Sequence, residues 1–326
     1  MTRYLFIGLV TFVSAFLVTV GVLMALAHYE FARIEVSDFS APEAVANEEE
    51  SATVLFVGDM MFDRYIRGRM EASGEDSVLA GVRDLLAGAD LTVGNLEGPI
   101  TPYASVSQGS KVGDLTNMRF TFNPTVADLL ARNGFDLVSL GNNHIRDFGT
   151  EGVVSSRNAL DAVGIKYVGD PTGFTAEPVV KDVNGMRMAF VAYSDFVGGD
   201  ADRAALAIET AEKIADTTVV LSHWGDEYET APPERVRELA RRFSLAGADL
   251  IIGTHSHIIG EMENLNGVPV YYSLGNFVFD QYWVPEVRCG LAVKATFTQE
   301  EKRVAIEVEE TRIGMEKDGR TVLGCS

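Results

Sequence analysis

The chain has 326 residues, of which 27 are Lys or Arg and 47 are Asp or Glu, so its formal net charge is −20 with neutral histidine. Hydrophobic residues make up 47% of the chain and charged residues 23%, values of an ordinary globular protein that exclude a wholly disordered chain. So acidic a chain lacks the basic face that binds a nucleic-acid backbone, and we expect no nucleic-acid partner.

The segment Tyr4–Ala27 contains no charged residue. As a helix it would be about 36 Å long, enough to cross a hydrocarbon core of about 30 Å. Arg3 precedes it and Glu30 follows it. The positive-inside rule therefore predicts a single-pass anchor in the cell membrane, with the N-terminus cytoplasmic and the domain extracytoplasmic. The alternative is a signal peptide cleaved at the A-x-A-like site Ala25–Ala27, which would release a secreted protein.

The chain is expected to have three parts. Residues 1–28 form the membrane anchor or signal segment, residues 29–51 an acidic spacer that includes the run Glu48–Glu50, and residues 52–326 one folded domain. The residues after Thr311 are short and polar and are expected to fray. Cys289 and Cys325 are the only cysteines, so at most one disulfide can form.

Within the domain, short apolar runs alternate with helical patterns. The predicted strands are Ala52–Val57, Leu91–Val93, Leu137–Leu140, Val179–Val183, Met186–Tyr193, Thr218–Leu221, Leu250–Ile252, Val268–Leu274, Leu291–Phe297 and Val304–Thr311. The predicted helices are Val78–Leu86, Asn123–Arg132 capped by Asn123, Thr150–Val163 capped by Thr150, Ala201–Ala215 and Pro233–Ala246. Asn184-Gly185 and Asn266-Gly267 predict hairpin turns. This alternation predicts a layered α/β domain, with two sheets packed face to face between helices.

Ligand-type side chains follow the strand-like runs. Four of the five histidines do so, namely His144, His223, His255 and His257. The same strand ends carry the acids and amides Asp59, Asn95, Glu97, Asn142 and Asn143. Because ligands bind beyond the carboxyl ends of strands in α/β sheets, we expect these side chains to converge on one site. Such nitrogen and oxygen donors suit Mn, Fe, Zn or Mg, and Asp59 or Glu97 would supply a bridging carboxylate.

Each of these residues also has a structural explanation by itself. His223 fits a capped core or surface histidine, Asp59 a helix N-cap, and Asn142 a turn residue. Glu97, followed by Gly98-Pro99, fits a turn carboxylate. Ligand-type residues at five strand ends are poorly explained by coincidence, and the pattern favours a shared metal site. The sequence contains neither a GxSxG elbow nor a P-loop motif.

Six motifs occur in a recognisable order. They are GDMMFDR (58–64), GNLEGPI (94–100), SLGNNHIRDFG (139–149), LSHWGDEY (221–228), GTHSHIIG (253–260) and YYSLGNFVFD (271–280). Together they resemble the CapA family of capsule and poly-γ-glutamate biosynthesis proteins, which is similar to the calcineurin-like metallophosphoesterases. The resemblance covers roughly residues 52–281. It implies a four-layer α/β/β/α sandwich of metallophosphoesterase type with a dinuclear metal site, here behind an N-terminal transmembrane helix.

The resemblance also implies roles for individual residues. The implied metal ligands are Asp59, Asn95, Glu97, Asn143, His223, His255 and His257. The implied catalytic residues are Asp59 and His144, with His144 as general acid or phosphate contact. The expected substrate-binding residues are Arg64, Asn142 and Asn276, with Arg146 as a second candidate to hold an anionic group.

Two positions depart from the superfamily pattern. Its Asp-x-His becomes Asp59-Met60-Met61, so one metal ligand is missing. Its Gly-Asp-x-x-Asp becomes Gly94-Asn95-Leu96-Glu97, so the bridging carboxylate is Glu97, or is absent with Asn95 in its place. We therefore expect either one or two divalent metal ions.

The function implied by the resemblance is that of a membrane-anchored, extracytoplasmic protein of capsule or poly-γ-glutamate biosynthesis with a metal-dependent phosphoesterase-type site. The expected partners are the membrane, a capsule synthesis or export complex, and an anionic polymer or phosphoester substrate. One alternative is a non-catalytic accessory subunit of a polymer synthesis or export complex. Another is a metal-dependent amide hydrolase that acts on exported polymer. The acidity of the domain counts against bulk binding of polyglutamate.

Overall fold

The computed structural model describes residues 18–26, 50–169, 171, 177–301 and 303–325, and the chain divides into two units, Met1–Glu48 and Glu49–Ser326. In the first unit, residues 18–26 are helical. No helix among the described residues has the length and apolar character needed to cross a bilayer. The remainder of the predicted anchor Tyr4–Ala27, and the predicted spacer up to residue 49, lie outside the described residues, so both stay predictions.

In the second unit, eight strands form the first sheet, in the order β14-β13-β12-β1-β2-β3-β4, with β11 also paired to β1. Their bounds are β1 Ser51–Met60, β2 Leu91–Leu96, β3 Leu137–Ser139, β4 Lys166–Val168, β11 Asn276–Val278, β12 Cys289–Gln299, β13 Val304–Met315 and β14 Thr321–Leu323. Strands β1 to β4 run parallel, and β11 runs parallel to β1, so β1, β2 and β3 end at one edge of the sheet. The pairs that β12, β13 and β14 form are antiparallel.

Six strands form the second sheet, in the order β5-β6-β7-β8-β10-β9. Their bounds are β5 Val179–Val183, β6 Met186–Ser194, β7 Thr217–His223, β8 Leu250–Thr254, β9 Met262–Leu265 and β10 Val268–Tyr271. Strands β6, β7, β8 and β10 are parallel neighbours, so β7 and β8 also end at a common edge.

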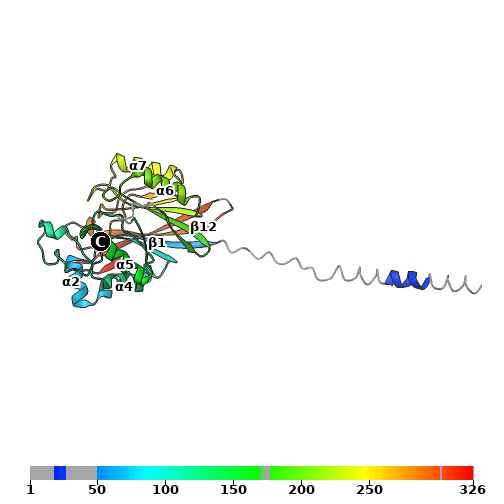
Figure 1. Ribbon diagram of the computed structural model, residues 1–326, viewed down its shortest axis with the longest axis horizontal. Coiled ribbons are helices and arrows are strands. Elements are labelled where there is room, and N and C mark those ends of the chain that lie inside the picture. Colours follow the sequence, from blue (N-terminus) through cyan, green and yellow to red (C-terminus); the bar gives the residue numbers. More distant parts are fainter. Residues whose placement is uncertain (1–17, 27–49, 170, 172–176, 302, 326) are drawn as a thin grey trace, which may run out of the picture. The chain divides into compact units, whose positions relative to one another are not determined.

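The two sheets pack face to face, and helices cover their outer faces (Figure 1). The helices are α2 Arg64–Ser73, α3 Arg83–Leu86, α4 Thr125–Arg132, α5 Gly149–Val163, α6 Ala201–Ala211 and α7 Glu234–Leu245, with 3₁₀ turns η1 Glu75–Val78, η2 Leu115–Met118 and η3 Glu286–Arg288. One core, which includes Leu130 of α4, lies between the first sheet and its helices. A second core, which includes Phe56 and Phe190, lies between the sheets, and a third, which includes Ile208 of α6, lies outside the second sheet. The domain is therefore an α/β sandwich, as predicted.

Both predicted hairpin turns are confirmed. Asn184-Gly185 connects β5 to β6, and Asn266-Gly267 connects β9 to β10. All four residues have positive φ, from 54° at Asn184 to 102° at Gly267. A two-residue turn between right-twisted strands requires this backbone, and Asn-Gly adopts it at least cost.

The predicted helix Val78–Leu86 is wrong, because the structure divides it into η1 and α3. The break contains Gly81, whose backbone bridges to Val322 of β14. A Cβ at Gly81 would lie 2.6 Å from the carbonyl oxygen of Thr321, so the two backbones approach too closely for a continuous amphipathic helix to cover this face.

Helix α2 has no counterpart among the predicted helices. Asp63 caps its N-terminus by accepting a hydrogen bond from the Arg64 backbone amide, and Ile66 and Met70 bury one face. Of the two predicted N-cap residues, Asn123 caps its helix and Thr150 does not. Asn123 accepts a hydrogen bond from the Thr125 backbone amide at 3.1 Å, whereas Thr150 lies inside the first turn of α5, which begins at Gly149.

The expectation that the chain frays after Thr311 is also wrong. Strand β13 continues to Met315, and β14 pairs with it through residues 321–323. Thr321 adds a side-chain hydrogen bond of 2.7 Å to the carbonyl oxygen of Phe277. Cys325 forms a disulfide with Cys289 at the start of β12. Edge pairing and this covalent link thus hold the C-terminal residues on the first sheet.

Candidate metal centre

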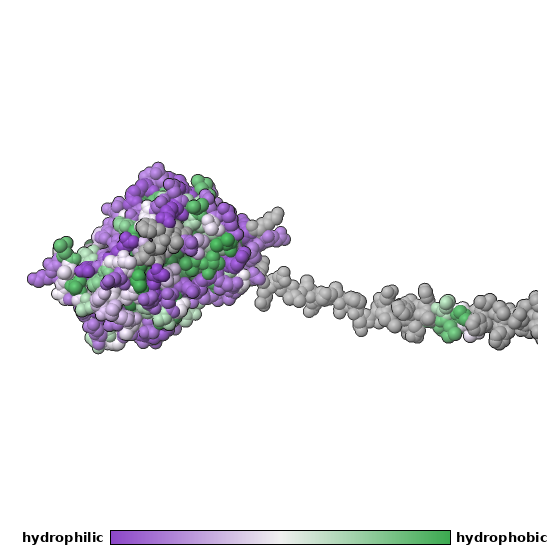
Figure 2. All heavy atoms as spheres, in the orientation of Figure 1, coloured by the Kyte–Doolittle hydropathy of each residue, from purple (hydrophilic) through white to green (hydrophobic). Residues whose placement is uncertain are grey.

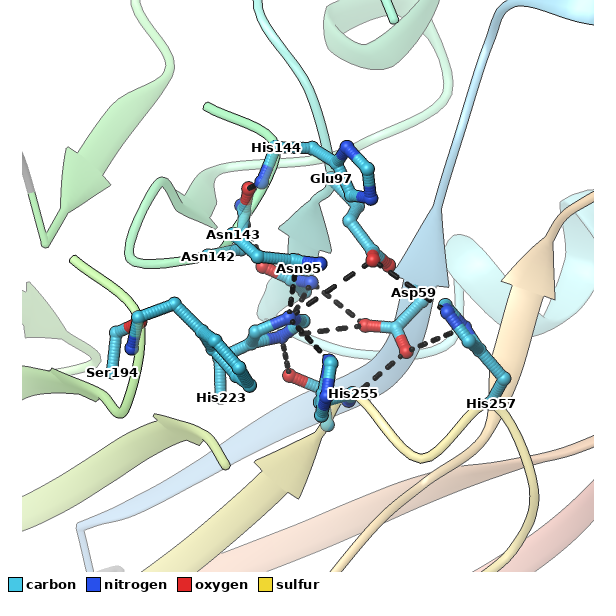
Figure 3. A network of polar contacts seen from close by, with 12 residues as sticks. Asp59, Asn95, Glu97, Asn142, Asn143, His144, Ser194, His223, His255 and His257 are labelled. Atoms are coloured by element: carbon cyan, nitrogen blue, oxygen red, sulfur yellow. Dashed lines mark hydrogen bonds and ion pairs between the residues drawn. The ribbon is translucent and has the colours of Figure 1, made fainter. Parts of the chain in front are cut away.

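The carboxyl ends of strands from both sheets meet at one polar cluster (Figure 3). In the first sheet, register places Asp59 of β1 opposite Asn95 of β2 on one side and opposite Asn276 of β11 on the other. Glu97 follows β2 directly, and the loop after β3 carries Asn142, Asn143 and His144. In the second sheet, His223 ends β7, and His255 and His257 follow β8. The structure therefore brings the predicted metal ligands and His144 together.

Asp59 is fully buried and fixed from several sides. Its Oδ1 accepts a hydrogen bond from Asn95 Nδ2 at 2.7 Å, and its Oδ2 accepts one from the His255 backbone amide at 3.1 Å. The His257 Nδ1 atom lies 3.4 Å from the same Oδ2. Burial raises the pKa of Asp59, but the hydrogen bond and charge of His257, with His223 and Asn95, outweigh it and lower the pKa to about 2. Asp59 is therefore an anion at neutral pH.

Glu97 is buried with neither carboxylate oxygen in a hydrogen bond to any described residue. Its Oε1 lies 4.0 Å from His223 Nε2 and 3.8 Å from His257 Nε2, beyond hydrogen-bond distance. Burial, followed by the nearby Asp59 carboxylate, raises the pKa of Glu97 well above its usual range. A buried acid without donors is costly, and a bound cation would satisfy both oxygens, so the residues present fit a metal ion.

Glu97 belongs to two groups of possible metal ligands. One group is Glu97, His223 and His255, and the other is Asp59, Glu97 and His257; in each, the ligand atoms lie within 4.8 Å of one another. A carboxylate shared between two sets of nitrogen and oxygen donors is the arrangement that bridges a pair of divalent ions. Asn95, the alternative bridging residue, uses its amide to bond Asp59 and Asn142. Of the two candidate bridging residues, only Glu97 has both oxygens free of hydrogen bonds to the described residues.

The histidines of the first group are held neutral. The His223 Nδ1 lies 2.9 Å from Thr254 Oγ1, while its Nε2 lies 2.9 Å from Asn143 Oδ1 and 3.2 Å from His255 Nδ1. Burial above all lowers the pKa of His223 well below its usual range and that of His255 to about 4. Facing the Asn143 oxygen, the His223 Nε2 carries the proton of the neutral ring, and a metal ion would replace that proton and take the ring nitrogen and the amide oxygen as donors.

A hydrogen bond also sets the orientation of His257. Its Nδ1 lies 2.9 Å from Asn276 Oδ1, an acceptor, so Nδ1 carries the proton and the Nε2 lone pair is directed to a metal. Both His255 and His257 have positive φ, 100° and 60°, which non-glycine residues rarely adopt. Such strain clusters at functional sites, where the surrounding structure enforces it.

His144 forms a pair with an acid that the sequence analysis missed. The His144 Nδ1 lies 2.9 Å from Asp147 Oδ2, and its ring packs on Phe120 with centroids 4.2 Å apart. Asp147 lies within the SLGNNHIRDFG motif three residues after His144, so the spacing was the available signal. Asn142 accepts a hydrogen bond from the His144 backbone amide and donates to Asn95 and to the Leu96 carbonyl. Asn142 thus ties the two loops together; its predicted contact with substrate stays a prediction.

The two candidate arginines differ in position. Arg64 makes an ion pair with Asp280 and lies over Phe120 and Phe279, at 4.9 and 5.6 Å from the ring centroids. These rings pack on His144 and His257, so the guanidinium lies beside the metal centre. Arg146 instead donates to the carbonyl oxygen of Pro171.

Met61 occupies the place of the missing histidine and serves packing. Its side chain is fully buried in the core of the first sheet, and its sulfur accepts a hydrogen bond from the Asp63 backbone amide at 3.0 Å. The group Asp59, Glu97 and His257 therefore lacks one donor that the sequence resemblance leads us to expect.

Comparisons with known proteins support the family resemblance that the sequence motifs indicate. Residues 53–281 match the family model of the "Bacterial capsule synthesis protein PGA_cap". The chain is 31% identical over 272 residues to the "PGA biosynthesis protein CapA" of Bacillus subtilis (strain 168), covering 78% of this chain and 70% of the relative. It is 31% identical over 265 residues to the "Capsule biosynthesis protein CapA" of Bacillus anthracis, covering 74% of this chain and 64% of the relative.

Two further matches are more distant. A "Probable polyglutamine synthesis accessory protein" of Mycobacterium tuberculosis (strain ATCC 25618 / H37Rv) is 28% identical over 171 residues, covering 44% of each chain. The crystal structure of TT1561 of Thermus thermophilus aligns with a TM-score of 0.42 at 10% identity, over 78% of this chain and 98% of that one. This likeness is too weak to bear on the fold.

Proposed function

The chain belongs to the family of bacterial capsule synthesis proteins and is a CapA-like protein of capsule or polyglutamate biosynthesis, and from this we propose that it carries a metal-dependent hydrolytic site of phosphoesterase type. We propose further that the sandwich has the four-layer metallophosphoesterase architecture. In this proposal residues 1–28 anchor the protein in the cell membrane, the domain from residue 52 lies outside the cytoplasm, and a capsule synthesis or export complex is its partner.

The single observation that carries the proposal is Glu97, a buried carboxylate with no hydrogen-bond partner among the described residues, shared by two groups of metal ligands. Asp59, Glu97 and His257 would hold one divalent ion. Glu97, His223 and His255, with Asn143, would hold the other. A bound ion of Mn, Fe, Zn or Mg supplies Lewis acidity that polarises a phosphoryl or carbonyl oxygen and makes water a better nucleophile at neutral pH.

The residues around the centre supply positioning and proton transfer. Asp147 holds His144 at Nδ1, so a proton given to the leaving oxygen of a substrate would move from Nε2. Arg64, whose guanidinium lies over the rings that pack on His144 and His257 and is paired with Asp280, would donate hydrogen bonds to a phosphoryl or carbonyl oxygen of the substrate. Asn276 acts indirectly, by fixing His257.

The second candidate function is that of a non-catalytic accessory subunit. The printed name of the mycobacterial relative and the loss of one ligand at Met61 favour it. A third, hydrolysis of an amide bond in exported polymer, would use the same residues, since the centre offers the same donors to a carbonyl as to a phosphoryl oxygen.

Hydrolysis assays with metal analysis separate these functions. The full-length protein is purified without chelator and assayed with nitrophenyl phosphomonoesters, nitrophenyl phosphodiesters and a short γ-linked glutamate oligomer. We expect phosphoester hydrolysis that falls by about 100-fold or more in His144→Asn, because general acid catalysis contributes about 10²–10⁴-fold. The metal content of this variant should match that of the wild type. Bound metal without hydrolysis of any substrate would support the accessory function instead.

Membrane topology is tested separately. Protease added to intact cells should digest the domain, because the proposal places residues 52–326 outside the cytoplasm. Complete protection in intact cells, with digestion after lysis, would contradict that orientation.

A further inference from the structure

A large groove opens beside the metal centre. Helix α2, the loop 107–118 and the segments 227–228 and 280–283 line it, and its volume is about 1030 Å³. Sites for small ligands are usually about 300–1,000 Å³, so this groove is large enough for a section of a chain. The loop 107–118, which includes η2, projects at one end of the domain (Figure 1).

The groove and the metal centre share a wall. Gln281 Nε2 donates to the Tyr228 hydroxyl at 3.3 Å, and Gln281 Oε1 accepts from Asn276 Nδ2 at 3.0 Å. Asn276 in turn accepts from His257, a member of one ligand group. A continuous chain of hydrogen bonds therefore runs from the groove wall at Tyr228 to the metal centre. The Tyr228 ring, which lines the groove, also lies 6.0 Å from the His257 ring, centroid to centroid, so a ligand against Tyr228 would lie beside His257.

The walls combine exposed rings with small polar residues. Tyr65 is 48% exposed, Tyr228 41% and Trp283 57%. The loop 107–118 supplies Ser107, Gln108, Gly109, Ser110, Gly113 and Asn117. Rigid aromatic rings next to Ser, Gly and Asn are the composition of surfaces that bind peptides and proteins, because rings give contact area while the small polar residues adapt their hydrogen bonds. Exposed apolar side chains gathered along one groove mark a binding site.

The charges of the groove are balanced. Two basic residues, Arg64 and Arg69, and two acidic residues, Glu227 and Asp280, line it. Arg64 is already paired with Asp280. The whole chain carries −20, and hydrophilic residues dominate the face of the domain in Figure 2. The groove thus has no surplus of positive charge to hold a row of carboxylates.

We propose that this groove binds an extended chain of amide-linked residues without ionised side groups, and that the chain lies along Tyr65, Tyr228 and Trp283 with one end at the metal centre. The proposal rests on one candidate of the proposed function, hydrolysis of an amide bond in exported polymer, since it names the class of polymer brought to that site. Its carbonyl and amide groups would bond the polar residues of the loop 107–118, and its apolar atoms would cover the rings.

Two matched oligomers test the charge selectivity. Both are short, γ-linked and fluorescently labelled; one carries free α-carboxylates and the other α-carboxamides. Binding to the full-length protein is measured by fluorescence polarisation. We expect the carboxamide form to bind at least about tenfold more tightly, with little change on adding salt, because no net charge attracts it. Equal or tighter binding of the carboxylate form would overturn the proposal.

Two variants locate the binding. Trp283→Ala and Tyr65→Ala should each weaken binding of the carboxamide oligomer by about tenfold, as loss of an aromatic anchor does. Tyr103→Ala is the matched control, because Tyr103 is 47% exposed against 48% for Tyr65 and does not line the groove. Trp283→Phe should restore most of the affinity. Wild-type affinity in both alanine variants, with wild-type metal content, would place binding elsewhere and overturn the proposal.

Binding by the Glu97→Gln variant separates the groove from the metal centre. This variant should lose metal and still bind the carboxamide oligomer, since Glu97 does not line the groove. Oligomer binding by protein that holds no metal in any preparation would contradict the proposed function and support the groove. Metal without binding of either oligomer would do the reverse.

Discussion

The metal centre and the groove are built from different parts of the fold. The predicted ligands of the centre lie on or shortly after β1, β2, β3, β7 and β8, and most are less than 5% exposed. The groove is lined mainly by a helix and loops, and its rings are about half exposed. Strand ends fix side chains to within a narrow range, which the chemistry of a metal site demands. Loops tolerate substitution, so the groove could come to bind a different polymer without any change in the ligands of the metal centre.

Glu97→Gln should have the largest effect and should fall on the centre alone. Glu97 belongs to both ligand groups, so its loss should lower the affinity for both metals, by more than the 10- to 100-fold typical of residues that only support a ligand. Metal titration of the full-length protein measures it. Glu238→Gln, an exposed glutamate on α7, is the matched control. Unchanged metal content in Glu97→Gln would rule out Glu97 as the shared ligand.

Substitution of His255 or His257 should weaken one of the two predicted metal sites and not the other. His255 and His257 belong to different groups, so His255→Ala and His257→Ala should each weaken one metal site by about tenfold or more and largely spare the other. Spectroscopy of Co²⁺-substituted protein distinguishes the two sites. Identical loss of both ions in both variants would show a single site instead of two.

His255 should take up a proton at lower pH than an exposed histidine does. Burial lowers the pKa of His255 to about 4, and an ordinary histidine has a pKa of about 6.5. Protons should therefore compete with metal at His255 only as the pH approaches 4, whereas Glu97, whose pKa is raised by burial, should protonate at higher pH. In the metal-free protein, the unfolded state binds more protons at His255 below about pH 6.5, so this histidine lowers the free energy of unfolding as the pH drops from there toward 4, while Glu97 acts in the opposite sense. Urea unfolding of the metal-free wild type and of His255→Ala at stepped pH isolates the contribution of the histidine. An equal pH dependence in the two proteins would contradict the burial argument.

Gln281→Leu should have the smallest effect, because it acts on the wall that the two regions share. Loss of its amide removes the hydrogen bonds that Gln281 makes to Asn276 and to the Tyr228 hydroxyl. Metal affinity and binding of the carboxamide oligomer should each fall by about three- to tenfold. Gln299→Leu, on the far end of β12, is the control. A change in only one of the two affinities would show that the regions are independent.

The sequence predicted the cluster of ligand-type side chains because strand ends leave a local signal; that the cluster binds metal stays a prediction. An apolar run followed by Gly-Asn-Leu-Glu or Thr-His-Ser-His identifies both the strand and the ligand, and parallel pairing then brings such ends together. Asn184-Gly185 and Asn266-Gly267 were similarly local. The choice between Asn95 and Glu97 needed coordinates, because only the hydrogen bonds of Asn95 show that its amide is already engaged.

The groove had no such signal. Tyr65, the loop 107–118, Tyr228 and Trp283 come from distant segments, and each by itself resembles ordinary surface. Helix α2 was missed because its apolar positions are few among charged residues, with Gly68 in the middle. The break at Gly81 depends on β14, more than 200 residues later, which no local pattern reports.

The most direct test of this account is the metal content per chain of the full-length protein, purified without chelator and then incubated with Mn²⁺ or Zn²⁺. Two ligand groups that share Glu97 predict about two equivalents of divalent metal, as in carboxylate-bridged metal pairs. Failure to bind metal under either condition would show that Glu97 is a buried acid and not a bridging ligand, and would remove the basis for hydrolysis at this site.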